Sequence, residues 1–162
     1  MKTLLLLRHA KSDWDNPDLK DFERPLNKRG LKAAPAVGSF LREQKVMPHL
    51  ILSSPAERAR QTTLLVMESA RLTADLRYDE RIYEASLERL MEVLSQIEDT
   101  ADVIMLVGHN PGLEALLEHL TGEAQKMPTA ALACLNLNLE KWGKVRERSA
   151  RLEWLVKPRD LL

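Results

Sequence analysis

The sequence is poor in cysteine, has no long hydrophobic run and carries no excess of charge of one sign. Its one cysteine, Cys134, excludes an intramolecular disulfide and a cluster of thiolate metal ligands. The apolar run Leu4–Leu7 ends at Arg8, so it is too short for a signal-peptide core or a membrane span. We therefore expect a cytoplasmic protein that makes no use of a membrane.

The charges balance, with 24 basic and 24 acidic side chains and a formal net charge of zero. This balance gives no global attraction to nucleic acid or to an anionic membrane, and any anion site must be built locally. The length of 162 residues predicts a single domain over residues 1–162. Hydrophobic residues at 44% and charged residues at 30% are ordinary for a globular protein.

Apolar runs alternate with segments of helical period, which is the pattern of an α/β sheet. Strands are expected at residues 3–7, 49–52, 76–78, 102–107, 135–139 and 152–156. Helices are expected at residues 29–44, from a capping box of Ser54 and Glu57, from Leu87, and from an Asn110 cap to Gly122. The expected buried stripe of the first helix is Leu31, Ala34, Val37 and Leu41.

Three predicted strands end at residues that can carry chemistry. Arg8-His9 follows the first strand, Ser53 to Arg58 follows the second, and Gly108-His109-Asn110 follows the strand at 102–107. Ligands of open α/β sheets bind beyond the carboxyl ends of the strands. If these strands are neighbours, two arginines and two imidazoles meet in one volume. The polar segment 11–28 is long for a loop of a compact domain, and such loops are often functional.

A phosphoryl group suits this combination of side chains. Arginine binds phosphate oxygens through paired N–H groups, and helix N-termini add backbone donors. A neutral imidazole can attack phosphorus, and nearby positive charge helps to keep it neutral. The structural alternatives are a solvated helix face for Arg58 and a simple turn for His109. Trp14 is either part of the pocket mouth or an exposed loop aromatic. The four histidines lack the helical spacing of a zinc motif.

The same segments resemble the histidine phosphatase superfamily, and within it the short SixA-type phosphohistidine phosphatases. The resemblance spans residues from about 2 to 115 and rests on these motifs: Arg8-His9-Ala10, Arg24-Pro25-Leu26, Arg29-Gly30, Ser53-Ser54-Pro55 with Arg58 and Gln61-Thr62, and Val107-Gly108-His109. It implies a phosphoglycerate-mutase-like fold, with three α/β/α layers and a mostly parallel mixed sheet. It also implies a metal-independent enzyme without a cofactor.

The resemblance further implies roles for single residues. His9 would become phosphorylated, and Arg8, Arg58 and His109 would bind the phosphoryl group. Glu80 is the candidate general acid, because Glu80-Arg81-Ile82-Tyr83 is similar to a Glu-Arg-x-Tyr segment of the mutases. The family's next residue is usually glycine and is Glu84 here. The other candidate acids are Glu84 and the loop residues Asp13, Asp15 and Asp21.

The sequence therefore predicts a hydrolase that works by double displacement through a phosphohistidine on His9. Its expected partner is a phosphorylated protein, with phosphohistidine first, and its product is inorganic phosphate. The short chain has no insertion large enough to cover the pocket, which favours a protein substrate. One alternative is a small-molecule phosphomonoesterase or an enzyme similar to phosphoglycerate mutase. Another is a module that binds a phosphorylated ligand without turnover.

Overall fold

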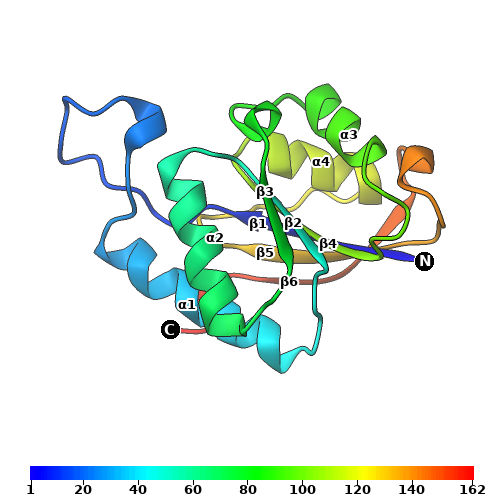
Figure 1. Cartoon of the computed structure of the whole chain (residues 1–162), viewed down its shortest axis with the longest axis horizontal. Helices are drawn as coiled ribbons and strands as arrows, with labels where there is room; N and C mark the ends of the chain where they lie inside the picture. Colours follow the sequence, from blue (N-terminus) through cyan, green and yellow to red (C-terminus); the bar gives the residue numbers. More distant parts are fainter.

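A computed structural model describes residues 1–162, and its six strands form one mixed sheet (Figure 1). The strands are β1 (Lys2–Arg8), β2 (Leu50–Ser53), β3 (Asp75–Tyr78), β4 (Val103–Gly108), β5 (Leu132–Leu137) and β6 (Ala150–Val156). Their order is β3-β2-β4-β1-β5-β6. The first four of these run parallel, whereas β5 is antiparallel to both of its neighbours. This confirms the predicted mostly parallel mixed sheet.

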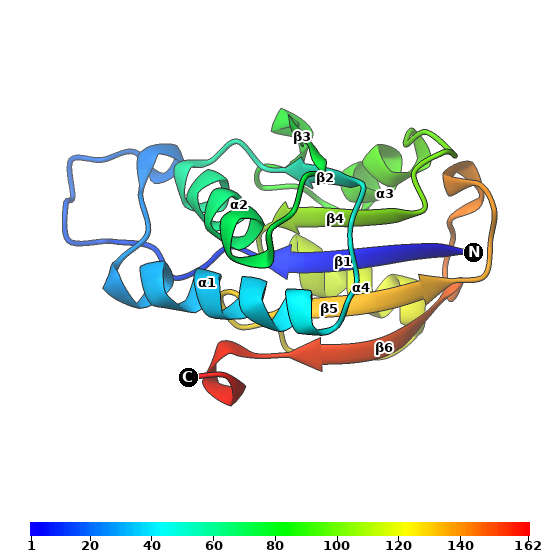
Figure 2. The same cartoon turned by 60° about the horizontal axis from the view of Figure 1, so that its bottom comes forward.

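Helices cover both faces of the sheet, which gives the three predicted layers (Figure 2). The helices are α1 (Lys28–Glu43), α2 (Glu57–Ala70), α3 (Leu87–Ser95) and α4 (Gly112–Thr121). Helices α1 and α2 pack together on one face, and α3 and α4 pack on the other. Strand β1 is buried on both sides, because Leu5 and Leu7 join the core under α1 and α2 while Leu4 and Leu6 join the opposite core.

The buried face of α1 is made of smaller residues than the sequence indicated. Ala34, Val37 and Leu41 are buried as predicted, but the prediction for Leu31 was wrong, since this side chain is 49% exposed. Small residues take its place because α1 lies very close to α2. A Cβ atom added to Gly38 would come within 2.8 Å of the Val66 carbonyl oxygen. A buried face predicted from the spacing of large apolar residues does not reveal such a close contact between two helices.

Two predicted helix caps were also wrong. Helix α2 begins at Glu57 with Ala56 as its cap, so Ser54 and Glu57 form no capping box. Helix α4 begins at Gly112, and Asn110 does not cap it. The reason is the same in both places, because each polar side chain has another partner. The Ser54 hydroxyl lies against His109, and the Asn110 amide donates to the Met127 carbonyl.

The order and register of the strands position the functional segments. Strand β4 lies between β1 and β2, with Arg8 paired to Gly108 and Ser53 paired to Val107. The three carboxyl ends are therefore adjacent, as expected for neighbouring parallel strands. None of the helices has both the length and the apolar character that a membrane crossing requires.

Candidate active site

Four of the residues singled out by the sequence converge beyond these strand ends. Arg8, His9, Arg58 and His109 line one hollow of about 310 Å³. An adjoining hollow of about 510 Å³ shares Arg58 and His109 and adds Asp21 and Glu84, together with other residues. The His9 and His109 rings lie 5.0 Å apart between centroids. The strands thus bring two guanidinium groups and two imidazoles together from segments far apart in the chain.

His9 is held in one tautomer by the backbone. Its Nδ1 lies 2.7 Å from the carbonyl oxygen of Ala10, and the side chain is only 7% exposed. A carbonyl only accepts, so Nδ1 carries the ring proton and Nε2 keeps its lone pair. The Ala10 N–H donates to Thr62 Oγ1 at 2.9 Å, and this hydroxyl donates to the Arg58 carbonyl at 2.7 Å. These two hydrogen bonds connect the loop after β1 to the first turns of α2.

Both imidazoles are neutral at ordinary pH. Burial, the largest cause, and the charges of Arg58 and Arg8 together lower the pKa of His9 to about 4, against the opposing hydrogen bond to Ala10. Burial, then His9 and Arg58, lower the pKa of His109 to about 3. A neutral imidazole with a free Nε2 is a nucleophile, whereas a protonated one is not.

His109 is positioned by Ser54, whose Oγ lies 2.7 Å from Nε2. The same hydroxyl accepts from the Ala56 N–H at 3.2 Å, which leaves its proton to donate to Nε2. This arrangement favours a ring proton on Nδ1, an atom that is buried and has no partner. The Nδ1 N–H of His109 is then a donor without a partner in the protein.

The arginines are anchored but keep unused donors. Arg58 donates from Nη1 to the Asp21 backbone oxygen at 2.8 Å and from Nη2 to Asp21 Oδ2 at 3.1 Å. Tyr83 donates to the same carboxylate oxygen at 2.6 Å. Although partial burial raises the pKa of Asp21, the bonds from Tyr83 and Arg58 lower it overall. Arg8 donates from Nη1 to the Met127 carbonyl at 3.1 Å, and its further N–H groups remain available.

Buried polar atoms without partners are concentrated here. Only four such side-chain atoms occur, and three of them belong to residues of the 310 Å³ hollow: Arg8 Nε, His109 Nδ1 and Asn110 Oδ1. Unpaired buried donors are costly, and in native proteins they usually mark a place where a ligand or water completes the bonding. Arg8 Nε is an N–H donor, and His109 Nδ1 is one in the favoured tautomer. Two of the three atoms therefore suit an anionic ligand.

The candidate acids separate in the structure. Glu80 is exposed and lines a neighbouring hollow of about 260 Å³ with Arg81, Tyr83 and Glu84, among others. It does not line the two hollows that contain His109, whereas Glu84 and Asp21 do. Glu84 has a φ of 51°, the left-handed region that favours glycine. Asp13 and Asp15 line none of these hollows.

Other residues of the site were given no definite role from the sequence. The Tyr83 ring meets His109 edge-on at 5.6 Å, and Thr62 joins Ala10 to α2. Thr62 follows Arg58 by four residues, so helical spacing alone could have placed it beside the site. Trp14 does line the 310 Å³ hollow and stacks under the Arg24 guanidinium at 4.1 Å. No group of three or more histidine, cysteine, aspartate or glutamate side chains is arranged to hold a metal ion.

Comparisons with known proteins agree with this geometry. The model of the histidine phosphatase superfamily (branch 1) matches residues 4–91. An uncharacterized chloroplastic protein of Arabidopsis thaliana is 33% identical over 97% of this chain and 78% of its own length. The crystal structure of a candidate phosphohistidine phosphatase SixA from Agrobacterium tumefaciens is 32% identical, with a TM-score of 0.84 over 97% of this chain and 98% of that one.

A protein histidine phosphatase SixA in complex with tungstate has the same fold, with a TM-score of 0.86 over 99% of both chains at 21% identity. The residues matched by the family model include His9, directly after β1, and Arg58, in the first turn of α2. The sequence match, the fold and the converging side chains show that this chain belongs to the histidine phosphatase superfamily, as a phosphatase that acts through a histidine.

Proposed function

We propose that this protein is a phosphohistidine phosphatase that removes phosphoryl groups from protein histidines through a covalent intermediate on His9. The state of His9 carries the proposal. Its Nδ1 proton is engaged by the Ala10 carbonyl, its pKa is about 4, and it lies beside Arg8, Arg58 and His109. A buried imidazole with a free Nε2 among N–H donors is equipped to attack a phosphoryl group.

In the first step, His9 Nε2 attacks phosphorus in line as the bond to the leaving group breaks. The bonding electrons depart with the leaving group, and a phosphoryl group remains on Nε2. The equatorial oxygens accept hydrogen bonds from Arg8, Arg58 and His109, which stabilise their charge in the transition state. A phosphohistidine substrate releases an imidazole that can depart already protonated, so this step places little demand on a general acid.

In the second step, water attacks the phosphohistidine and the P–N bond breaks. Inorganic phosphate is released and His9 returns to its neutral form, while the water proton passes to a carboxylate or to the phosphate itself. We assign the carboxylate role to Glu84, because it lines the hollow that contains Arg58 and His109. Glu80 lines the neighbouring hollow, and the hydrogen bonds from Tyr83 and Arg58 lower the pKa of Asp21 and so weaken it as a base. Asp21 is then a positioning residue for Arg58.

Three observations support a protein substrate. The connections that follow β2 and β4 are short, and the long loop of residues 11–27 reaches the site through Asp21 rather than as a separate cap. The site consists of adjoining surface hollows, which leave room for a side chain carried on another protein. A solved relative at 32% identity is described as a candidate phosphohistidine phosphatase. A mutase must instead hold a small substrate while it reorients.

The proposal is tested by comparing kcat/KM for a phosphohistidine peptide, a phosphoserine peptide and 3-phosphoglycerate. We expect the phosphohistidine peptide to be the best substrate and His9→Ala to abolish its turnover. His49→Ala is the matched control, because His49 is exposed and lines none of the hollows of the site. Faster turnover of 3-phosphoglycerate would replace the protein substrate by a small one. Binding of phosphate without turnover of any substrate would indicate a binding module.

A further inference from the structure

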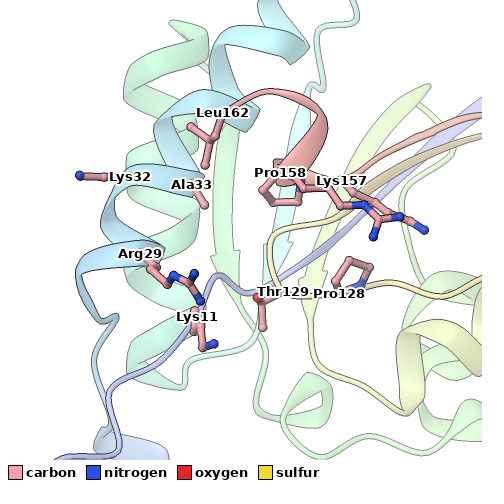
Figure 3. Close-up of a pocket in the computed structure, with 10 residues that line it drawn as sticks. Lys11, Arg29, Lys32, Ala33, Pro128, Thr129, Lys157, Pro158 and Leu162 are labelled. Carbon is pink, nitrogen blue, oxygen red and sulfur yellow. The ribbon is translucent and has the colours of Figure 1, made fainter.

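A further cavity, of about 380 Å³, adjoins the site and is rich in positive charge (Figure 3). It is lined by Lys11, Arg29, Lys32, Ala33, Pro128, Thr129, Lys157, Pro158, Arg159 and Leu162. We refer to it as the basic pocket. Its walls come from the loop after β1, from α1, from the segment before β5 and from η4 (Pro158–Asp160) after β6. Five of its side chains are basic and none is acidic.

The cations of the basic pocket have no partners within the protein. None of its lysines or arginines lies within 4.0 Å of a carboxylate oxygen. Elsewhere on the surface, Arg60, Arg77 and Arg81 each pair with a nearby carboxylate. Because the whole chain has no net charge, this unpaired group is a local concentration of positive potential. Such a field attracts an anionic partner.

The basic pocket is continuous with the hollow that contains His9, because Lys11 and Thr129 line both. The connection is fixed by the backbone. The N–H of Ala130, next to Thr129, donates to the His9 carbonyl at 2.9 Å. On the other side, α1 lies so close that a Cβ atom on Gly30 would overlap the Lys11 carbonyl oxygen. A ligand that reaches both places is therefore held by one rigid surface.

We propose that the basic pocket binds acidic side chains that flank the phosphorylated residue of a protein substrate. This inference rests on the proposed function and adds a preference for sequence context. The arrangement of the cations supports a polypeptide. Figure 3 shows Arg29 and Lys11 beside each other, Lys157 on the opposite side and Lys32 directed away. Charges spread in this way match several carboxylates along a chain better than one compact phosphate. Ala33, Pro128 and Pro158 provide apolar contact between them.

The test compares two phosphohistidine peptides that differ only in their flanking residues, Asp and Glu in one and Asn and Gln in the other. For the unaltered protein, we expect kcat/KM to be about 10-fold higher for the acidic peptide at low salt, with the preference decreasing as salt screens it. In Arg29→Gln/Lys157→Gln, the ratio between the peptides should fall towards one. A ratio near one in the unaltered protein, or an unchanged ratio in the variant, would overturn the proposal.

Lys141→Gln/Lys144→Gln is the matched control. It removes the same charge from exposed residues around η3 (Trp142–Lys144), which lies near the amino end of β1 and away from the site (Figure 1). The control should keep the peptide ratio of the unaltered protein. A small bisphosphate is the alternative ligand. If Arg29→Gln/Lys157→Gln weakened the binding of 2,3-bisphosphoglycerate and left the peptide ratio intact, the basic pocket would serve a small molecule and the proposal would fail.

Binding is also measured without chemistry, by calorimetric titration of the unphosphorylated acidic peptide. We expect the unaltered protein to bind it and Arg29→Gln/Lys157→Gln to bind it several-fold more weakly. This result would stand even if no phosphorylated substrate were turned over, in which case only the proposed function would fail. Conversely, both phosphopeptides could be turned over at the same rate while the acidic peptide does not bind. That result would overturn the proposal that the basic pocket binds acidic side chains, and it would leave the phosphatase proposal intact.

Discussion

Acid should destabilise this protein, and His9 should cause a measurable part of the loss. The pKa of His9 is about 4 in the folded state against an ordinary value of 6.5. Because the folded-state pKa is the lower one, the unfolded chain takes up its proton first as pH falls. Stability is then lost from about pH 6.5 down to about pH 4. At about pH 5 these values give a loss of about 2 kcal/mol from His9 alone.

The assay is urea unfolding in phosphate-free buffer, followed by the fluorescence of tryptophans that include the fully buried Trp142. Phosphate is omitted because a ligand of the folded state would mask the effect. Between about pH 7.5 and about pH 5, the unaltered protein should lose about 2 kcal/mol more than His9→Asn. The exposed control His49→Asn should follow the unaltered protein. An equal loss in all three proteins would show that His9 is not buried among cations as described.

Three further predictions concern the supports of the site. Thr62→Val leaves the Ala10 N–H buried without an acceptor, and the free energy of unfolding in urea should fall by about 1–3 kcal/mol. Gly30→Ala places a methyl group against the Lys11 carbonyl oxygen and should lower the free energy of unfolding by about 1–3 kcal/mol, measured by thermal unfolding. Gly143→Ala is the control and should have little effect, because the nearest atom to its added Cβ lies at 3.8 Å. Glu84→Gly relieves the left-handed backbone and should add about 1 kcal/mol relative to Glu84→Ala in urea unfolding. Both Glu84 variants should hydrolyse a phosphoserine peptide more slowly. If both variants were as active as the unaltered protein, Glu84 would have no part in proton transfer.

The sheet and the meeting of four side chains were predictable, because both depend on regular patterns. Continuous apolar runs indicate buried parallel strands, and residues that follow neighbouring parallel strands must lie together. Arg8 is the last residue of one such strand, and His9 and His109 each follow one directly. Their convergence required only that β1 and β4 be neighbours, which the resemblance supplied and the sheet order shows.

The remaining features depend on contacts between distant segments. Ser54 has the spacing of a helix cap, but His109, which lies 55 residues further along, takes up its hydroxyl. Asp21 reaches Arg58 from a long loop whose path no local pattern fixes. The placement of Glu84 depends on its positive φ angle. The only signal of this angle in the sequence was that the related enzymes usually have glycine at this position. The unpaired cations of the basic pocket are visible only when three segments are seen together.

The most direct test of the account is to trap the covalent intermediate. The protein is incubated with a phosphorus-labelled phosphohistidine peptide and quenched rapidly, and the label on the chain is located by peptide mapping. The account predicts label on His9 that is labile in acid and stable in base, present in His49→Ala and absent from His9→Ala. Product release without label on His9, or label that persists in His9→Ala, would contradict the claim that His9 is the nucleophile.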